Sequence, residues 1–332
     1  MSQALREIAG RSVRDLEAFR RDVCLPCQPV VLRGLVAEWP AVAAGRSPWT
    51  LREYLLSFDN GGRMDAFVGG AAIAGKYYYG DDLKGFNFER RPMRLADAIT
   101  AIVDGMDGKT IYAGSLPADD FLPGFSADNP MPLAPMGAGR IWLGNASNVS
   151  SHYDTLDNLA CVIAGKRRFT LYAPDLIGGL YVGPIDNTMA GQPVSLAASL
   201  PTDAQRFPLF ESIRDQGLVA ELEPGDALYL PKLWWHQVEA TASVNGLINY
   251  WWDGFSSGPD APCTAMLLAM IAIAERPLAE RTAWRALFDH YVFRTNGHPL
   301  AHIPEEQHGL LGPLKANYGK LRARVLHLLR GG

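Results

Sequence analysis

The sequence predicts a mainly β fold with flanking helices: a double-stranded β-helix, or jelly roll, followed by a helical C-terminal region. Two observations lead to this fold class. Short runs of β-branched and aromatic residues alternate with Pro and Gly turns across residues 140–253. Segments with helical spacing of apolar residues lie before that region and fill residues 262–332. The strand-rich part therefore forms the predicted core.

Residues 1–110 are expected to supply helices and strands that pack on the jelly roll. A strand there would carry the apolar run Pro29-Val30-Val31-Leu32. The elements expected around it are a helix over 12–19 capped by Ser12, a helix over 49–56, short strands within 63–90, and a helix that begins at Arg94.

Residues 111–255 are expected to form the jelly-roll core. A strand from Thr110 would enter it, and long loops over 114–139 and 174–208 would lie near its mouth as lids or binding surfaces. The strands expected within the core cover 141–145, 158–165, 166–173, 221–223, 227–231, 237–240 and 246–252.

Residues 256–332 are expected to be helical, with helices after Pro262, over 278–293 and over 314–329. The last helix would place Leu314, Leu321, Val325 and Leu328 on one side. We expect this region to build a homodimer. The alternative is that these helices pack back on their own jelly roll.

The bulk composition limits the classes of partner. The chain has 332 residues, 48% hydrophobic and 20% charged, with a net charge of −4, so it shows no basic footprint for nucleic acid or membrane. The apolar stretch 265–274 is too short to cross a bilayer, which needs about 20 residues. The first residues do not resemble a signal peptide. We therefore expect a cytoplasmic protein with no nucleic-acid or membrane partner.

The four cysteines do not form a disulfide or zinc framework. Cys24 and Cys27 make a single C-x-x-C, which is open to two readings: a redox pair, or two reduced thiols in a loop, the reading we favour.

Three residues form the predicted metal site: His152, Asp154 and, 84 residues after His152, His236. Side chains two apart on a strand point to the same side, so His152 and Asp154 can converge on one ion. Two imidazoles and one carboxylate suit a non-heme Fe(II) centre, which keeps coordination positions open. The alternative is that all three make ordinary hydrogen bonds in a metal-free protein.

The sequence around these residues resembles the cupin-like JmjC-type Fe(II)- and 2-oxoglutarate-dependent oxygenases, in particular their asparaginyl hydroxylases. The resemblance covers about the first 255 residues and is strongest over 140–253. The segments that carry it are His152-Tyr153-Asp154, Asn158, Gly165-Lys166-Arg167-Arg168, Phe207-Pro208, Pro224-Gly225-Asp226, Trp234-Trp235-His236, Asn249-Tyr250-Trp251, and Pro29 to Gly34 with Trp39-Pro40.

The resemblance implies Fe(II), 2-oxoglutarate as co-substrate, O₂, and hydroxylation of a protein side chain or a small molecule. It places a cation for the distal carboxylate of 2-oxoglutarate after the strand that ends at Gly165. The family usually has Lys at the position of Arg167. Strand alternation puts Arg167 on the apolar face with Phe169 and Leu171, so we expect Arg167 rather than Lys166 to bind the carboxylate.

Further co-substrate residues follow from the same resemblance. They are Tyr112, Asn158, Asn249, Ser150 and Trp251. Tyr112 and Trp251 could equally be core aromatics, and Ser150 stands only near the position of a family Thr. The Arg at position 167 and the missing Thr support an alternative, a non-catalytic or 2-oxoglutarate-independent cupin that binds metal. An isomerase that uses no 2-oxo acid is a third reading.

Overall fold

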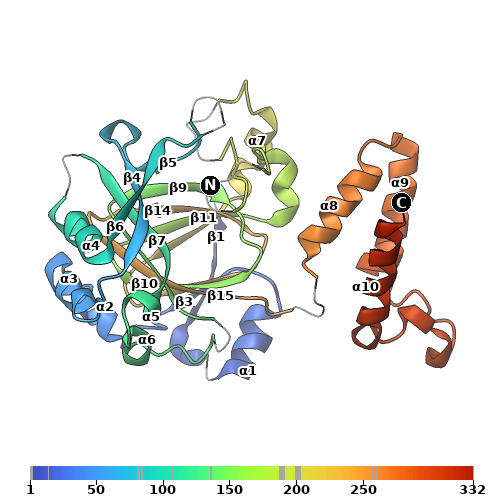
Figure 1. Cartoon of the computed structure of the whole chain (residues 1–332), viewed down its shortest axis with the longest axis horizontal. Helices are drawn as coiled ribbons and strands as arrows, with labels where there is room; N and C mark the ends of the chain where they lie inside the picture. The colour runs from blue at the N-terminus through green and yellow to red at the C-terminus, as the bar shows by residue number, and fades with distance from the viewer. Residues whose placement is uncertain are drawn as a thin grey trace. The chain divides into compact units, whose positions relative to one another are not determined.

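The computed structural model describes residues 3–13, 15–80, 83, 85–105, 108–134, 137–186, 191–198, 203–255, 258 and 260–331. It divides into two compact units, Met1–Gly254 and Phe255–Gly332 (Figure 1). Among the described residues, no helix is both long and apolar enough to cross a membrane.

The first unit is a jelly roll of two sheets. Within the described ranges, one sheet has the strand order β1-β12-β11-β14-β9-β5 and the other β2-β3-β13-β10-β15-β8-β7-β4-β6. The strands are β1 (Gln3–Ala4), β2 (Arg6–Ala9), β3 (Val30–Arg33), β4 (Arg63–Gly69), β5 (Lys76–Tyr77), β6 (Phe88–Arg94), β7 (Thr110–Pro117), β8 (Arg140–Gly144), β9 (Ser147–His152), β10 (Asp157–Ala164), β11 (Arg167–Tyr172), β12 (Leu218–Leu222), β13 (Ala227–Leu230), β14 (Trp235–Ala240) and β15 (Asn245–Trp252). The first 110 residues therefore contribute strands to both sheets.

Strand β10 shows why the core has two layers. All eight of its residues are buried. Leu159, Cys161 and Ile163 belong to the larger hydrophobic cluster, while Ala160 and Val162 belong to the cluster that contains Phe169 of β11. Because successive side chains on a strand point to opposite faces, a strand covered on both faces needs a continuous apolar run.

Helices cover the outer face of the sheet that contains β10. They are α2 (Pro40–Ala44), α3 (Pro48–Leu56) and α4 (Leu95–Asp104), and Figure 1 shows them grouped at the edge of this unit. The approach is close at Gly45, where a Cβ would lie 1.9 Å from the carbonyl oxygen of Ile163. A larger residue at that position would separate the helix from the sheet.

Three predicted elements differ from the structure. The first helix, α1 (Leu16–Phe19), starts later than predicted, because Asp15 rather than Ser12 caps it by accepting from the amide of Ala18. The stretch 114–139, predicted as a loop, contains the end of β7 and the helices α5 (Ala118–Phe121) and α6 (Phe125–Asp128). The stretch 174–208 includes the 3-10 helix Pro174–Gly179 and the first residue of α7 (Pro208–Ile213).

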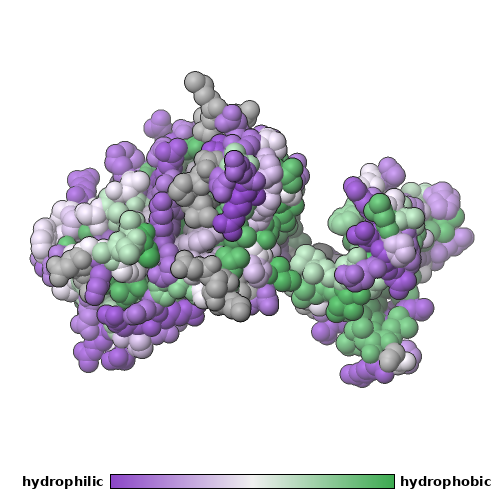
Figure 2. All heavy atoms as spheres, turned by 90° about the horizontal axis from the view of Figure 1, so that it is seen from above, coloured by the Kyte–Doolittle hydropathy of each residue, from purple (hydrophilic) through white to green (hydrophobic). Residues whose placement is uncertain are grey.

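The second unit is helical, as predicted. Its main helices are α8 (Pro262–Ile273), α9 (Leu278–Phe288) and α10 (Leu314–Arg330). Helix α8 has no buried residue, and its Ile271 is 84% exposed. Figure 2 shows apolar side chains, in green, on the surface of this unit at the right of the view.

Candidate metal and co-substrate site

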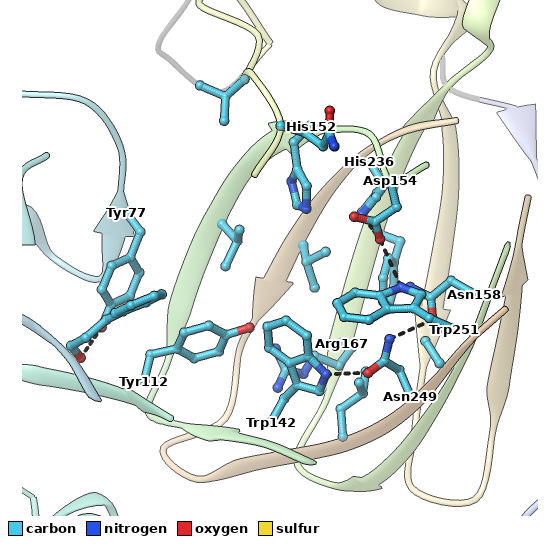
Figure 3. Close-up of a pocket in the computed structure, with 18 of the residues that line it drawn as sticks. Tyr77, Tyr112, Trp142, His152, Asp154, Asn158, Arg167, His236, Asn249 and Trp251 are labelled. Atoms are coloured by element: carbon cyan, nitrogen blue, oxygen red, sulfur yellow. Dashed lines mark hydrogen bonds and ion pairs between the residues drawn. The ribbon is translucent and has the colours of Figure 1, made fainter. Parts of the chain in front are cut away.

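The predicted metal ligands meet at one end of the cavity. His152, the last residue of β9, pairs in register with His236 of β14. Their ring centroids are 4.3 Å apart, and a carboxylate oxygen of Asp154 lies 3.8 Å from Nε2 of His236. One donor atom from each of the three residues lies within 4.8 Å of the others (Figure 3). A single ion can be reached by all three.

Asp154 reaches this point in a way that the sequence did not predict. It was expected on the same strand as His152, but β9 ends at His152 and Asp154 lies two residues beyond it. Its carbonyl oxygen accepts a hydrogen bond of 2.8 Å from the amide of Leu233, in the turn before β14. The backbone of the turn therefore fixes the carboxylate beside His236.

Both imidazoles are oriented by backbone carbonyls. Nδ1 of His152 donates to the oxygen of Ser150 at 2.8 Å, and Nδ1 of His236 donates to the oxygen of Trp234 at 3.0 Å. Each ring then keeps the lone pair of Nε2 for a ligand. Burial, together with the neighbouring His152, lowers the pKa of His236 to about 4, so this imidazole is neutral at physiological pH. Two imidazoles and one carboxylate fit a divalent transition metal with open positions.

Trp251 lines the cavity and also contacts the carboxylate of Asp154. Its indole N–H donates to Oδ2 of Asp154 at 3.2 Å, and its ring meets that of Trp142 edge to face at 5.7 Å. The hydrogen bond restricts rotation of the Asp154 carboxylate. Such outer contacts set the geometry of a metal ligand.

Arg167 lines the same cavity. Its side chain is 2% exposed, and its Nε and Nη2 atoms have no hydrogen-bond partner. Burial lowers the pKa of Arg167. Leaving buried guanidinium donors without partners is costly, so this position favours an anionic ligand. A carboxylate of a dicarboxylic acid suits the two free donors.

The neighbouring cations point elsewhere, as the predicted alternation requires. Lys166 is exposed and pairs with Glu223 at 2.9 Å. Arg168 is exposed on β11 and faces Glu221 and Glu239. Of this basic run, only Arg167 lines the cavity.

Asn158 and Asn249 form a polar pair across strands β10 and β15. The amide of Asn249 donates to Oδ1 of Asn158 at 3.1 Å, and the indole N–H of Trp142 donates to Oδ1 of Asn249 at 2.6 Å. Trp142 was not among the predicted site residues. Alternation on β8 could have found it, because its neighbours Ile141 and Leu143 are buried and Trp142 points to the opposite face of the strand.

The remaining predicted residues divide between the cavity and its surroundings. Tyr112 of β7 lines the cavity, and burial raises its pKa to about 12, which keeps it a hydrogen-bond donor. Ser150 is buried, and its hydroxyl donates to the carbonyl of Tyr77 at 2.8 Å. Ser150 is not among the described residues that line the cavity.

Three lining residues were not predicted from the sequence: Phe67, Tyr77 and Phe88. They line the cavity from short strands without a distinctive motif.

Comparison with known proteins gives a family match over most of the chain. The sequence pattern of the cupin-like domain matches residues 16–258. Jumonji C domain-containing protein 5 of Drosophila melanogaster is 35% identical over 115 residues, which cover 34% of this chain and 27% of that protein.

Two longer alignments are weaker in identity. The bifunctional peptidase and (3S)-lysyl hydroxylase JMJD7 of Homo sapiens is 24% identical over 271 residues, covering 71% of this chain and 80% of that protein. Lysine-specific demethylase JMJ30 of Arabidopsis thaliana is 27% identical over 266 residues, covering 76% of this chain and 56% of that protein. The chain spans 27% and 56% of the lengths of the Drosophila and Arabidopsis relatives.

Proposed function

The chain belongs to the cupin-like, JmjC-type domain family, and from this premise we propose that it is an Fe(II)- and 2-oxoglutarate-dependent dioxygenase. It hydroxylates a protein side chain or a small molecule. The observation that carries the proposal is the pairing of two features in one cavity: a His-Asp-His cluster, and a buried Arg167 with two unpartnered donor atoms.

His152, Asp154 and His236 would hold the metal, and Asp154 would offset one of its two positive charges. Bound iron with 2-oxoglutarate and O₂ supplies the oxidation of C–H to C–OH, while 2-oxoglutarate becomes succinate and CO₂. The Trp251 indole keeps the carboxylate of Asp154 oriented, and the aromatic side chains around the ligands exclude water.

Arg167 would bind the distal carboxylate of 2-oxoglutarate through its free Nε and Nη2 atoms. Tyr112 lines the same cavity, and its hydroxyl would donate to the same carboxylate. Asn158 and Asn249, held by each other and by Trp142, would fix the polar wall beside the co-substrate. Ser150 is left out of this set because its hydroxyl is engaged with Tyr77.

The test is the release of succinate from labelled 2-oxoglutarate by the full chain, with and without Fe(II). We expect iron-dependent release that is lost in Asp154→Ala. Stoichiometric metal binding without 2-oxoglutarate binding would favour the metal-binding cupin or an isomerase. Absence of both metal and 2-oxoglutarate binding would contradict the proposal.

We also propose that the protein is a homodimer built from its C-terminal helices. Support comes from exposed apolar side chains on α8 and α10, including Ile271, Val325 and Leu328, which are 84%, 46% and 63% exposed. A cytoplasmic location stays a prediction from composition.

A further inference from the structure

We propose that the substrate group that enters this cavity is an uncharged, apolar side chain, aliphatic or aromatic, rather than the charged side chain of lysine. This inference rests on the proposed dioxygenase function and names the substrate class of the same site. It separates this chain from the relatives whose names include lysyl hydroxylase and lysine-specific demethylase.

An aromatic wall lines the cavity. Phe67 of β4, Tyr77 of β5 and Phe88 of β6 contribute one ring each. Measured between ring centroids, Phe88 lies 4.9 Å from Phe67 and 5.4 Å from Tyr77, and Tyr77 lies 5.8 Å from Tyr112. Tyr77 and Tyr112 are labelled in Figure 3. We call Phe67, Tyr77 and Phe88 the aromatic wall. It offers the large, rigid apolar area that binds apolar groups.

The hydroxyl of Tyr77, the polar group of the aromatic wall, is already hydrogen-bonded. The hydroxyl of Tyr77 donates to Oγ1 of Thr110 at 3.1 Å, and Thr110 is not among the described residues that line the cavity. Tyr77 therefore offers the cavity its ring and not its hydroxyl. Val194 extends the apolar surface, since it lines the cavity and packs in the same hydrophobic cluster as Phe88.

The charges in the cavity are balanced before any substrate enters. Besides its two imidazoles, the described lining has one carboxyl group, that of Asp154, and one guanidinium, that of Arg167. A divalent metal and Arg167 bring three positive charges. Asp154 and the two carboxylates of 2-oxoglutarate bring three negative ones. A cationic substrate would find no described carboxylate left to pair with it, and an unpaired buried charge is costly.

Phe67 of the aromatic wall already contacts a cation, because the guanidinium carbon of Arg90 lies 5.4 Å from the centroid of its ring. The ring face that Arg90 covers is therefore not open to an ammonium group. An uncharged group would instead bury its apolar surface against the same rings.

The test compares two probes that differ only by an ammonium group. They are the N-acetyl amides of norleucine and lysine, with that of phenylalanine as an aromatic probe. The full chain is loaded with Zn²⁺ and 2-oxoglutarate, so that no turnover occurs, and binding is followed by tryptophan fluorescence, to which Trp142 and Trp251 in the cavity contribute. We expect both neutral amides to bind at least ten-fold more tightly than the lysine amide.

A charge introduced into the wall should reverse this order. Phe88→Glu is expected to weaken the norleucine amide at least ten-fold and to make the lysine amide the tighter ligand. Leu209→Glu, on an exposed side chain of α7, is the matched control and should keep the wild-type order. Phe88→Leu keeps the wall apolar and should also keep the wild-type order of affinities. This variant still tests the apolar wall if Phe88→Glu does not fold.

Two results would overturn the inference. One is that wild-type protein binds the lysine amide as tightly as, or more tightly than, the norleucine amide. The other is that none of the three probes binds. Failure of the proposed function has a different signature, because the Zn²⁺-loaded protein would then not bind 2-oxoglutarate and iron would not induce succinate release.

Discussion

Asp154 is held in place by two other segments of the chain, the turn before β14 through its backbone and β15 through Trp251. Neither contact is local in sequence. The sequence predicted which three residues would meet, because the H-x-D pair and the distant His have recognisable neighbours. It could not predict that Asp154 leaves the strand, since that depends on how the turn before His236 packs against it.

We predict that iron binding requires the three ligands together. His152→Ala and Asp154→Ala should each abolish stoichiometric Fe(II) binding, because two remaining protein donors hold a divalent ion poorly in competition with water. The measurement is metal content after equilibration with Fe(II) under anaerobic conditions. His302→Ala, which removes an exposed imidazole from the second unit, is the control and should keep full metal content. Full metal content in Asp154→Ala would rule out the assignment.

We predict that replacing Arg167 has opposite effects on binding and on stability. Arg167→Met should weaken 2-oxoglutarate binding by at least ~2 kcal/mol, because it removes a charged hydrogen-bond partner. The same change should stabilise the metal-free, ligand-free fold by about 1 kcal/mol or more, because it removes a buried and unpaired charge. Titration of the metal-loaded protein and urea unfolding of the free protein measure the two effects.

Lys166→Ala is the matched control for Arg167→Met. Its side chain is 65% exposed, so the substitution should leave the affinity for 2-oxoglutarate within about two-fold of wild type. A larger loss of affinity in Lys166→Ala than in Arg167→Met would show that Lys166, and not Arg167, binds the distal carboxylate of 2-oxoglutarate.

At the scale of elements, the sequence pattern predicted a strand most clearly where that strand is buried on both faces. The apolar run of β10 and the glycine that follows it predicted that strand. The alternation of Arg167 with Phe169 and Leu171 on β11 predicted that Arg167 points inward. The helices α5 and α6 have four residues each, and contacts such as that between Asp119 and the amide of Ser126 hold them. Helices this short are set by tertiary contacts and carry little sequence signal.

We predict that Gly165 is essential to the turn that joins β10 to β11. Its φ is +71°, and a Cβ there would lie 2.3 Å from Oδ1 of Asn245 and 2.6 Å from the carbonyl oxygen of Val244. Gly165→Ala should destabilise the fold by about 2 kcal/mol or more, since both backbone strain and steric overlap oppose it. It should also weaken 2-oxoglutarate binding, because Arg167 is two residues away.

Urea unfolding measures this loss, with Gly178→Ala as the matched control. Gly178 has a negative φ, and no heavy atom lies within 4 Å of a Cβ at its position, so that substitution should change stability by less than about 0.5 kcal/mol. Equal stability of the two variants would contradict the role of the turn.

At the scale of the whole molecule, the family pattern ends at residue 258 and the first compact unit at Gly254. The helices beyond that point were predicted from apolar spacing alone. On α10, Leu314 and Leu321 are half-buried while Val325 and Leu328 are exposed, so part of the predicted apolar face is already covered. Spacing indicates which side of a helix is apolar, but it does not identify what covers that side.

We predict that the exposed part of this face joins two copies of the chain. Light scattering of the wild-type protein should give about 73 kDa, twice the 36.3 kDa of one chain. Ile271→Glu combined with Leu328→Glu should give the mass of one chain, because each substitution places a charge in an apolar contact. Deletion of residues 310–332 should have the same effect.

Leu25→Glu provides the control for the homodimer. Leu25 lies in the first unit and, like Leu328, is 63% exposed, so Leu25→Glu tests whether a new surface charge alone dissociates the protein. It should leave the mass at that of two chains. A wild-type mass of one chain at micromolar concentration, or a dimer that persists in both the double variant and the deletion, would contradict this arrangement. If the double variant dissociates but keeps iron-dependent succinate release, the C-terminal helices serve assembly and do not complete the site.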